Sequence, residues 1–262
     1  MSVASFQQAL CDLIASPRLC LALRANPEAV LVNYELSARE RTRLTEVVRQ
    51  RGMSTNCTLY RSNRVTPIYT LLNYTCRSLG DQFGPLLDQF WDAKDYQDGQ
   101  FQSEVERFAA FLRQRIADGA VSSPFAAELL EFELALNALE FAPRKGLLLE
   151  IASLPPPEPD TPCRLHPLAR ISRFRHDPAV LLAAAARGVM PALDLPQQDA
   201  VIVVSVVDSA LDIVQLPAQD CRALAEDAGA IQSLTPRRAP TLANARLLVP
   251  RGYALSSLLC HP

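Results

Sequence analysis

Apolar residues recur every three to four positions for well over a hundred residues from the start of the chain, which is the spacing of amphipathic helices. One such stripe consists of Val105, Phe108, Phe111, Leu112 and Ile116. Ser37 and Glu40 form a capping box, and the helix that they open is predicted to run to about Arg51 and to stop at Gly52. The pattern predicts an all-α helical bundle over residues 1–153.

The helical periodicity breaks at residues 154–162, where five of nine residues are proline. Proline lacks an amide donor and clashes with the preceding helical turn, so this segment is predicted to be an extended linker. Beyond it, β-type runs at 201–207 and 211–216 predict a hairpin, and Pro217 opens a helix. Residues 163–262 are therefore expected to form a small α+β module with an antiparallel sheet, which places the chain in the α+β class.

The run 200–207 is nearly all β-branched, and two interpretations of it stay open. In the first, it is a buried central strand with a structural role. In the second, it lies at a sheet edge, where unpaired amides accept an added strand from a peptide. A further strand is predicted at 146–151, where the chain leaves the bundle.

Composition narrows the classes of function. The net charge of −2 gives no overall attraction to nucleic acid or to anionic membranes, so neither is expected as a partner. No apolar run approaches the roughly 20 residues that span a bilayer, and the first residues lack a signal-peptide pattern, so we expect a cytoplasmic protein. The seven cysteines include no C-x-x-C pair and are expected to be reduced and mostly buried.

Motifs for catalysis are missing from the sequence. It contains no glycine-rich phosphate loop, no G-x-S-x-G and no H-E-x-x-H. Its three histidines are too few for a histidine-rich metal site within this chain. We therefore expect no enzyme by itself and no cofactor in this chain. A thiol enzyme built on one of the cysteines is the alternative, and it would require a solvent-reactive thiol.

Two groups of arginines are candidate contacts for partners. Arg170, Arg173 and Arg175 form the tightest basic cluster, which is either a solvated strand edge or a positive rim for an acidic peptide. Arg61 and Arg64 flank a predicted helix start, where the helix dipole does not favour positive charge. Either a salt bridge or a contact with a partner protein explains this second pair.

The hairpin followed by residues 216–229 resembles the peptide-recognition modules of winged-helix type from ribosomal peptide biosynthesis, in which a hairpin enters a helix that ends in L-x-x-x-x-G. The segments 26–37 and 64–80 resemble a small helical domain of several bacterial accessory proteins. Together, the two halves resemble the partner subunit of multinuclear-iron peptide-modifying oxygenases of the methanobactin and 3-thiaglutamate type.

This resemblance implies an accessory subunit that forms a heterodimer with an iron-dependent oxygenase. It would bind the leader of a ribosomally made precursor peptide and present the peptide for oxidation of its cysteine, while the partner enzyme holds the iron. The second module would then be winged-helix-like. A related helical domain occurs in proteins labelled as DNA-binding, so a DNA-binding transcriptional regulator is the rival hypothesis.

Leader recognition predicts specific contacts. We expect the peptide to add a strand beside the hairpin, with the helix from Pro217 as the other wall of a groove. The apolar contacts would come from Val203, Val204, Val206, Leu216 and Leu224. The arginines Arg170, Arg173 and Arg175 would attract acidic leader residues, and Arg61 with Arg64 would dock onto the oxygenase.

Overall fold

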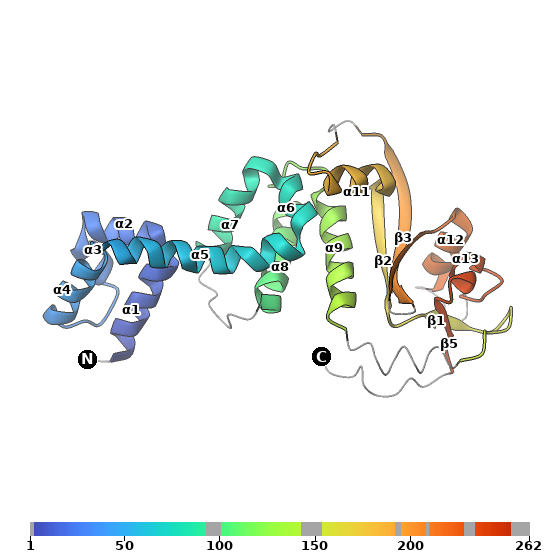
Figure 1. The fold of residues 1–262 in the computed structure, drawn as a ribbon, viewed down its shortest axis with the longest axis horizontal. Helices are drawn as coiled ribbons and strands as arrows, with labels where there is room; N and C mark the ends of the chain where they lie inside the picture. The colour runs from blue at the N-terminus through green and yellow to red at the C-terminus, as the bar shows by residue number, and fades with distance from the viewer. Residues whose placement is uncertain are drawn as a thin grey trace. The chain divides into compact units, whose positions relative to one another are not determined.

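The computed structural model of the chain is a mixed α+β protein with a small antiparallel sheet (Figure 1). It describes residues 3–92, 101–142, 154–191, 195–207, 210–227 and 234–252. The strand predicted at 146–151 lies outside the described residues. The chain divides into two compact units, of which the first comprises Met1–Thr70 and Gly84–Leu112 and the second comprises Leu71–Phe83 and Arg113–Pro262.

The first unit is built from helices. They are α1 (Val3–Ala15), α2 (Pro17–Ala25), α3 (Pro27–Leu31), α4 (Ala38–Val47), α5 (Arg51–Leu71), α7 (Phe83–Asp92) and the first part of α8 (Phe101–Ala117). The predicted capping box is confirmed, since the Ser37 hydroxyl accepts from the Glu40 amide and the Glu40 carboxylate accepts from the Ser37 amide. A buried cluster that includes Leu13, Leu23 and Leu44 joins α1, α2 and α4.

In this unit, the predicted end of one helix and the predicted start of another are wrong. The helix that Ser37 opens ends at Val47 and does not reach Arg51, and Gly52 lies inside α5 instead of ending a helix. A glycine costs a helix only about 1 kcal/mol, which the burial of neighbouring α5 residues such as Met53 offsets. Arg61 and Arg64 consequently lie in the middle of α5 and not at a helix start.

In its described residues, the second unit combines α6 and α9, which precede the proline-rich segment, with the strands that follow that segment (Figure 1). Its elements are α6 (Asn73–Leu79), a short 3-10 turn (Gly80–Gln82), α9 (Ala126–Glu140), β1 (Cys163–Leu165), β2 (Ala169–His176), α11 (Pro178–Ala186), β3 (Gln197–Val207), β4 (Ala210–Gln215), α12 (Ala218–Asp227), α13 (Pro240–Asn244) and β5 (Leu248–Pro250). Gly80, at a φ of 51°, ends α6 in a conformation that favours glycine.

Over the described residues, the sheet contains three antiparallel strands in the order β2-β3-β4, and β1 pairs separately with β5. The predicted hairpin is confirmed: β3 pairs with β4 from Ile202 opposite Gln215 to Val207 opposite Ala210. One face of the sheet packs on α9 and α11 through a cluster that includes Phe132, Phe174 and Val204. The other face packs on α12 and α13.

The packing of α9 on β2 joins the last described helix before the proline-rich segment to the sheet that follows it. The boundaries of the two compact units therefore differ from the domain boundary predicted around residue 153. Residues 154–162 contain neither helix nor strand, as predicted. This segment is attached to the second unit, because the Arg237 amide donates to the Pro159 carbonyl at 2.9 Å and the Arg237 guanidinium pairs with Asp160 at 3.1 Å.

Candidate functional site

Strand β3 lies between β2 and β4, so the first interpretation of the β-branched run is correct: it is a buried central strand. Both of its edges are already paired, and a peptide cannot add beside it. Val203, Val204 and Val206 are fully buried. The prediction that they are exposed contacts for a peptide is corrected accordingly.

The apolar residues predicted to bind the peptide lie on opposite faces of the sheet. Val204 and Val206 belong to the cluster under α9 and α11. Val203, Leu216 and Leu224 belong to the cluster under α12 and α13. Alternate residues of a strand point to opposite faces, and each of these five side chains is needed to fill a core.

The three predicted arginines all lie on β2, which is the strand at one edge of the sheet. Arg170 and Arg173 point to opposite faces, because Arg170 is opposite Val204 while Arg173 is opposite Val201. The guanidinium of Arg170 donates to the carbonyls of Pro167 at 2.7 Å and Ala169 at 2.9 Å. The sequence cluster is therefore divided between the two sides of the sheet.

Arg173 and Arg175 have exposed side chains. Arg173 lies on the α12 side, where burial raises the pKa of the Cys221 thiol and the Arg173 guanidinium opposes that effect. Arg175 lies at an irregularity of the ladder between Phe174 and His176. Of the three arginines, these two have side chains open to a charged ligand.

The outer end of β2 is occupied by α9. One carboxylate oxygen of Glu128 accepts from the amides of Arg175 at 2.8 Å and His176 at 3.3 Å, and the other contacts the His176 ring. Glu128 and His176 are both buried. The sequence did not predict this buried pair, because Glu128 lies 48 residues from His176 and neither residue belongs to a recognised motif. The Glu128 carboxylate thus accepts hydrogen bonds from the Arg175 and His176 amides, which an added strand would otherwise bind.

Strand β4 is the opposite edge of the sheet and presents the better surface for an added strand. In the described part of the chain it pairs with β3 alone. Its residues are mostly exposed, including the large apolar side chains of Leu211 (51% exposed) and Ile213 (47% exposed). These two side chains continue the α9 face of the sheet, since they lie opposite Val206 and Val204.

Ladder geometry identifies which amides of β4 point away from β3. The Leu216 amide donates to the Val201 carbonyl at 2.8 Å, so the backbone groups of every second residue before it, Val214 and Asp212, face β3. The groups of Gln215, Ile213 and Leu211 point outward. The Ile213 amide indeed bonds to the Asp212 side chain at 2.9 Å instead of to a strand.

The two halves of the predicted site are thus on different edges. The arginines are on β2, and the exposed edge is on β4, two strand spacings or about 9.5 Å away. A peptide strand paired with β4 contacts Leu211 and Ile213 but does not reach the backbone of β2. Sequence alternation places residues on faces, but it does not give the order of the strands.

In the first unit, salt bridges account for Arg61 and Arg64. Arg64 pairs with Glu104 at 2.7 Å, and only 14% of its side chain is exposed. Arg61 pairs with Asp88 and lies 4.9 Å from the centre of the Trp91 ring. The Arg61 side chain is 36% exposed, which leaves it as the more accessible of the two.

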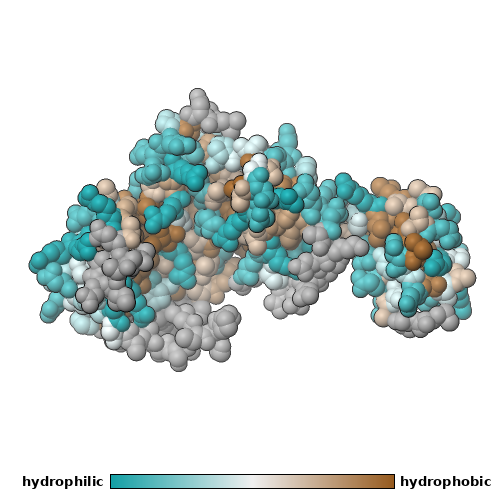
Figure 2. Space-filling view, turned by 180° about the vertical axis from the view of Figure 1, so that it is seen from behind, coloured by the Kyte–Doolittle hydropathy of each residue, from teal (hydrophilic) through white to brown (hydrophobic). Residues whose placement is uncertain are grey.

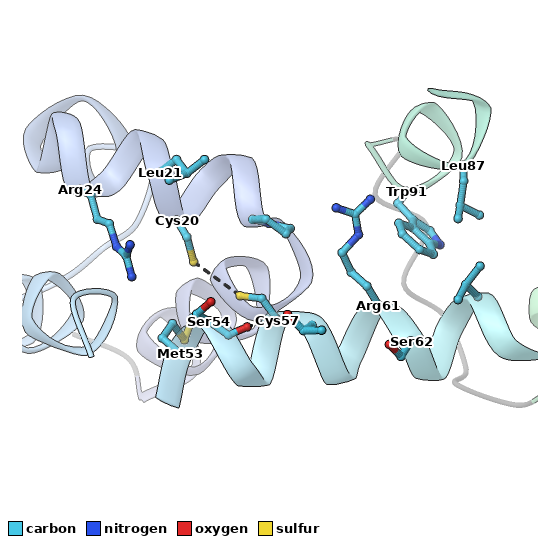
Figure 3. A pocket seen from close by; sticks show the side chains of 13 residues that line it. Cys20, Leu21, Arg24, Met53, Ser54, Cys57, Arg61, Ser62, Leu87 and Trp91 are labelled. Carbon is cyan, nitrogen blue, oxygen red and sulfur yellow. Dashed lines mark hydrogen bonds between the residues drawn. The ribbon is translucent and has the colours of Figure 1, made fainter. Parts of the chain in front are cut away.

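Arg61 also lines a pocket of about 540 Å³ between α2, α5 and α7 (Figure 3). Cys20 and Cys57 lie on its wall with their sulfur atoms 3.9 Å apart. The sequence did not predict this pair of thiols, because the two cysteines are far apart along the chain. Apolar surface is visible on this unit in Figure 2, and its large side chains exposed by more than half include Leu21, Val32 and Leu59.

In comparisons with known proteins, no protein-family profile and no curated protein matches this chain. Within the described residues, none of the helices combines the length and apolar character that crossing a membrane requires. Over the same residues, His, Cys, Asp and Glu side chains do not gather in threes that could hold a metal ion.

Proposed function

We propose that this chain is a non-catalytic subunit that binds an iron-dependent oxygenase and presents a ribosomally made precursor peptide for oxidation of its cysteine. The proposal rests on the resemblance of its two halves to accessory subunits of that class. The iron and the chemistry belong to the partner enzyme. This chain binds and orients the peptide, and its C-terminal module acts as the winged-helix-like recognition module of the family.

The observation that carries the peptide-binding part is the outer edge of β4. It combines outward-pointing backbone groups at Leu211, Ile213 and Gln215 with two exposed apolar side chains. Strand addition draws its affinity from main-chain hydrogen bonds and its specificity from alternate side chains. In the proposed complex, the Ile213 amide exchanges its bond to Asp212 for a bond to a leader carbonyl.

Leader side chains on the α9 side of the sheet pack against Leu211 and Ile213. Those on the other side lie near Val214, which is partly buried against the cluster under α12. Charge on Arg173 and Arg175 acts on the peptide only at a distance, because β3 separates β2 from β4. Arg61 is the proposed contact for the oxygenase, since its side chain is more exposed than that of Arg64.

The test is binding of a fluorescently labelled candidate precursor, a short cysteine-containing peptide sought among the genes that neighbour this one, to the full chain and to the Ile213→Pro variant. Proline removes one outward amide without removing a bond to β3, so the variant is expected to fold and to lose tenfold or more in affinity, at about 1.4 kcal/mol per tenfold. Ile213→Val, which keeps the amide, is the matched control and should bind within about threefold.

Two outcomes would overturn the proposal. Equal affinity of the folded Ile213→Pro variant and the parent chain would remove β4 as the binding edge. Oxidation of the peptide by this chain with no oxygenase present would remove the non-catalytic role. Duplex DNA serves as a competitor in the same assay, and displacement of the peptide with a steep salt dependence would favour the DNA-binding alternative.

A further inference from the structure

Cys20 of α2 and Cys57 of α5 bring two thiols together inside the first unit (Figure 3). Their sulfur atoms are 3.9 Å apart, and both sulfurs lie near the Leu13 carbonyl, at 2.9 Å for Cys20 and 3.5 Å for Cys57. Both residues are 6% exposed and neither is in a disulfide. The two helices thus hold the thiols as a preformed pair.

The pair lies on the wall of the pocket described above. Both cysteines are among its lining residues, together with Arg24, Met53 and Trp91. A volume of about 540 Å³ lies in the range of small-molecule sites and admits a reagent of several tens of atoms. A small molecule that enters the pocket would therefore lie beside both cysteines.

We propose that Cys20 and Cys57 form a thiol–disulfide exchange site that takes a low-molecular-weight disulfide from the pocket and closes into an intramolecular disulfide. In the first step, the thiolate of one cysteine attacks the small disulfide and expels one thiol. The second cysteine then attacks the mixed disulfide and expels the other thiol. One small disulfide and two protein thiols give one protein disulfide and two small thiols, so electrons and protons balance.

Closure requires the sulfurs to approach from 3.9 Å to about 2.05 Å, which side-chain rotation and a small shift between α2 and α5 supply. The pair is separated by 37 positions in sequence, so the bond would close a long loop of the unfolded chain. Cross-links of long loops stabilise a folded unit by constraining its unfolded state.

The environment of the two thiols sets the rate of thiol–disulfide exchange. Burial and the neighbouring Cys57 thiol raise the pKa of Cys20 to about 12, while Arg24 opposes this effect. Since the thiolate is the nucleophile, Cys20 is mostly protonated at neutral pH. Attack by Cys20 is therefore slow at neutral pH, and its rate rises with pH.

The test treats the full chain with oxidised glutathione at mildly alkaline pH, blocks the remaining thiols, and maps the peptides by mass spectrometry. We expect a Cys20–Cys57 linked peptide and a rise in Tm of roughly 5–15 °C that a reductant reverses. In the folded chain, Cys20→Ser and Cys57→Ser should each abolish both effects. The matched control, Cys163→Ser, alters a buried thiol of the second unit and should leave both unchanged.

The mapping needs no variant, so a variant that fails to fold does not weaken the test. A glutathione adduct that stays on one of the two cysteines would contradict closure. So would recovery of both thiols unmodified after prolonged exposure. Peptide binding is read separately, because the thiols are in the first unit and β4 is in the second.

Discussion

The carboxylate of Glu133 accepts two hydrogen bonds from Thr75, one from its backbone amide at 2.8 Å and one from its hydroxyl at 2.7 Å. The other carboxylate oxygen accepts from the Tyr74 amide at 2.7 Å. These amides belong to the first turn of α6, whose N-cap residue Leu72 supplies no side-chain acceptor. Glu133 of α9 therefore caps α6 from a distance of 58 residues in sequence.

Removal of this cap should be costly, because it leaves buried donors without an acceptor. We expect Glu133→Ala to lower the free energy of unfolding by about 2–4 kcal/mol, and Glu133→Gln by less, since one amide oxygen can keep part of the bonds. Glu131→Ala, which breaks an exposed pair with Arg113, is the control and should cost at most about 1 kcal/mol. Urea denaturation measures all three, and equal losses at positions 133 and 131 would contradict the capping role.

Stability should depend on pH through His166. Burial lowers the pKa of His166 to about 4, and its Nδ1 accepts from the Leu168 amide at 2.9 Å, which requires that nitrogen to be unprotonated. The unfolded histidine titrates near 6.5, so the unfolded state binds more protons between the two values. As pH falls from about 6.5 to about 4, we expect up to about 3 kcal/mol of stability to be lost.

The variant His166→Gln isolates this effect. Glutamine does not titrate, so the difference between the parent chain and the variant should shrink as the pH falls through this window. Unfolding free energies measured across the range give that difference directly. Parallel curves for the two proteins would mean that His166 is not buried in its neutral form.

Arg61 and Arg64 of α5 should differ in their effect on stability. Arg64 compensates the buried Glu104, which also accepts from Arg107 at 2.7 Å, so Arg64→Met should cost about 2–4 kcal/mol. Arg61→Met breaks a more exposed pair and should cost at most about 1 kcal/mol. Thermal unfolding, followed through the fluorescence of Trp91, compares the two. If Arg61 contacts the oxygenase, its variant loses complex formation while it stays folded.

Of two positions that face each other across the hairpin, proline should disrupt the fold at one and leave the fold intact at the other. The Val206 amide donates to the Leu168 carbonyl at 3.0 Å, so the Val204 amide, two residues earlier, also points toward β2. Val204→Pro should therefore remove a ladder bond in the core and unfold the second unit. Ile213→Pro, at the outer edge of β4, should leave the circular dichroism spectrum unchanged.

Charge reversal at Arg173 should affect peptide binding only weakly. The arginine is exposed on β2, two strands from the proposed binding edge. We expect Arg173→Glu to slow association with an acidic leader by no more than about threefold, with an effect that disappears at high salt. Association rates at low and high salt test this, and a loss that persists at high salt would indicate direct contact with Arg173.

Local sequence was sufficient for the features that depend on residues a few positions apart. The capping box of Ser37 and Glu40 and the β3–β4 hairpin are of this kind. So is the irregular segment 154–162, since its prolines exclude helix whatever surrounds them. These interactions form within a single turn or between adjacent strands, and their residue types therefore predict them.

Only the tertiary structure determined which faces of the helices and strands pack against each other. An apolar stripe on α9 is compatible with a helical bundle, but Phe132 packs against Phe174 of β2. The β-branched run is compatible with an edge, but both sides of β3 are paired, and the exposed edge falls to β4. Cys20 and Cys57 meet across 37 positions. The periodicity shows that one face of a helix or strand is apolar, but it does not identify the segment that packs on that face. Contacts between segments distant in sequence depend on the packing of the whole unit.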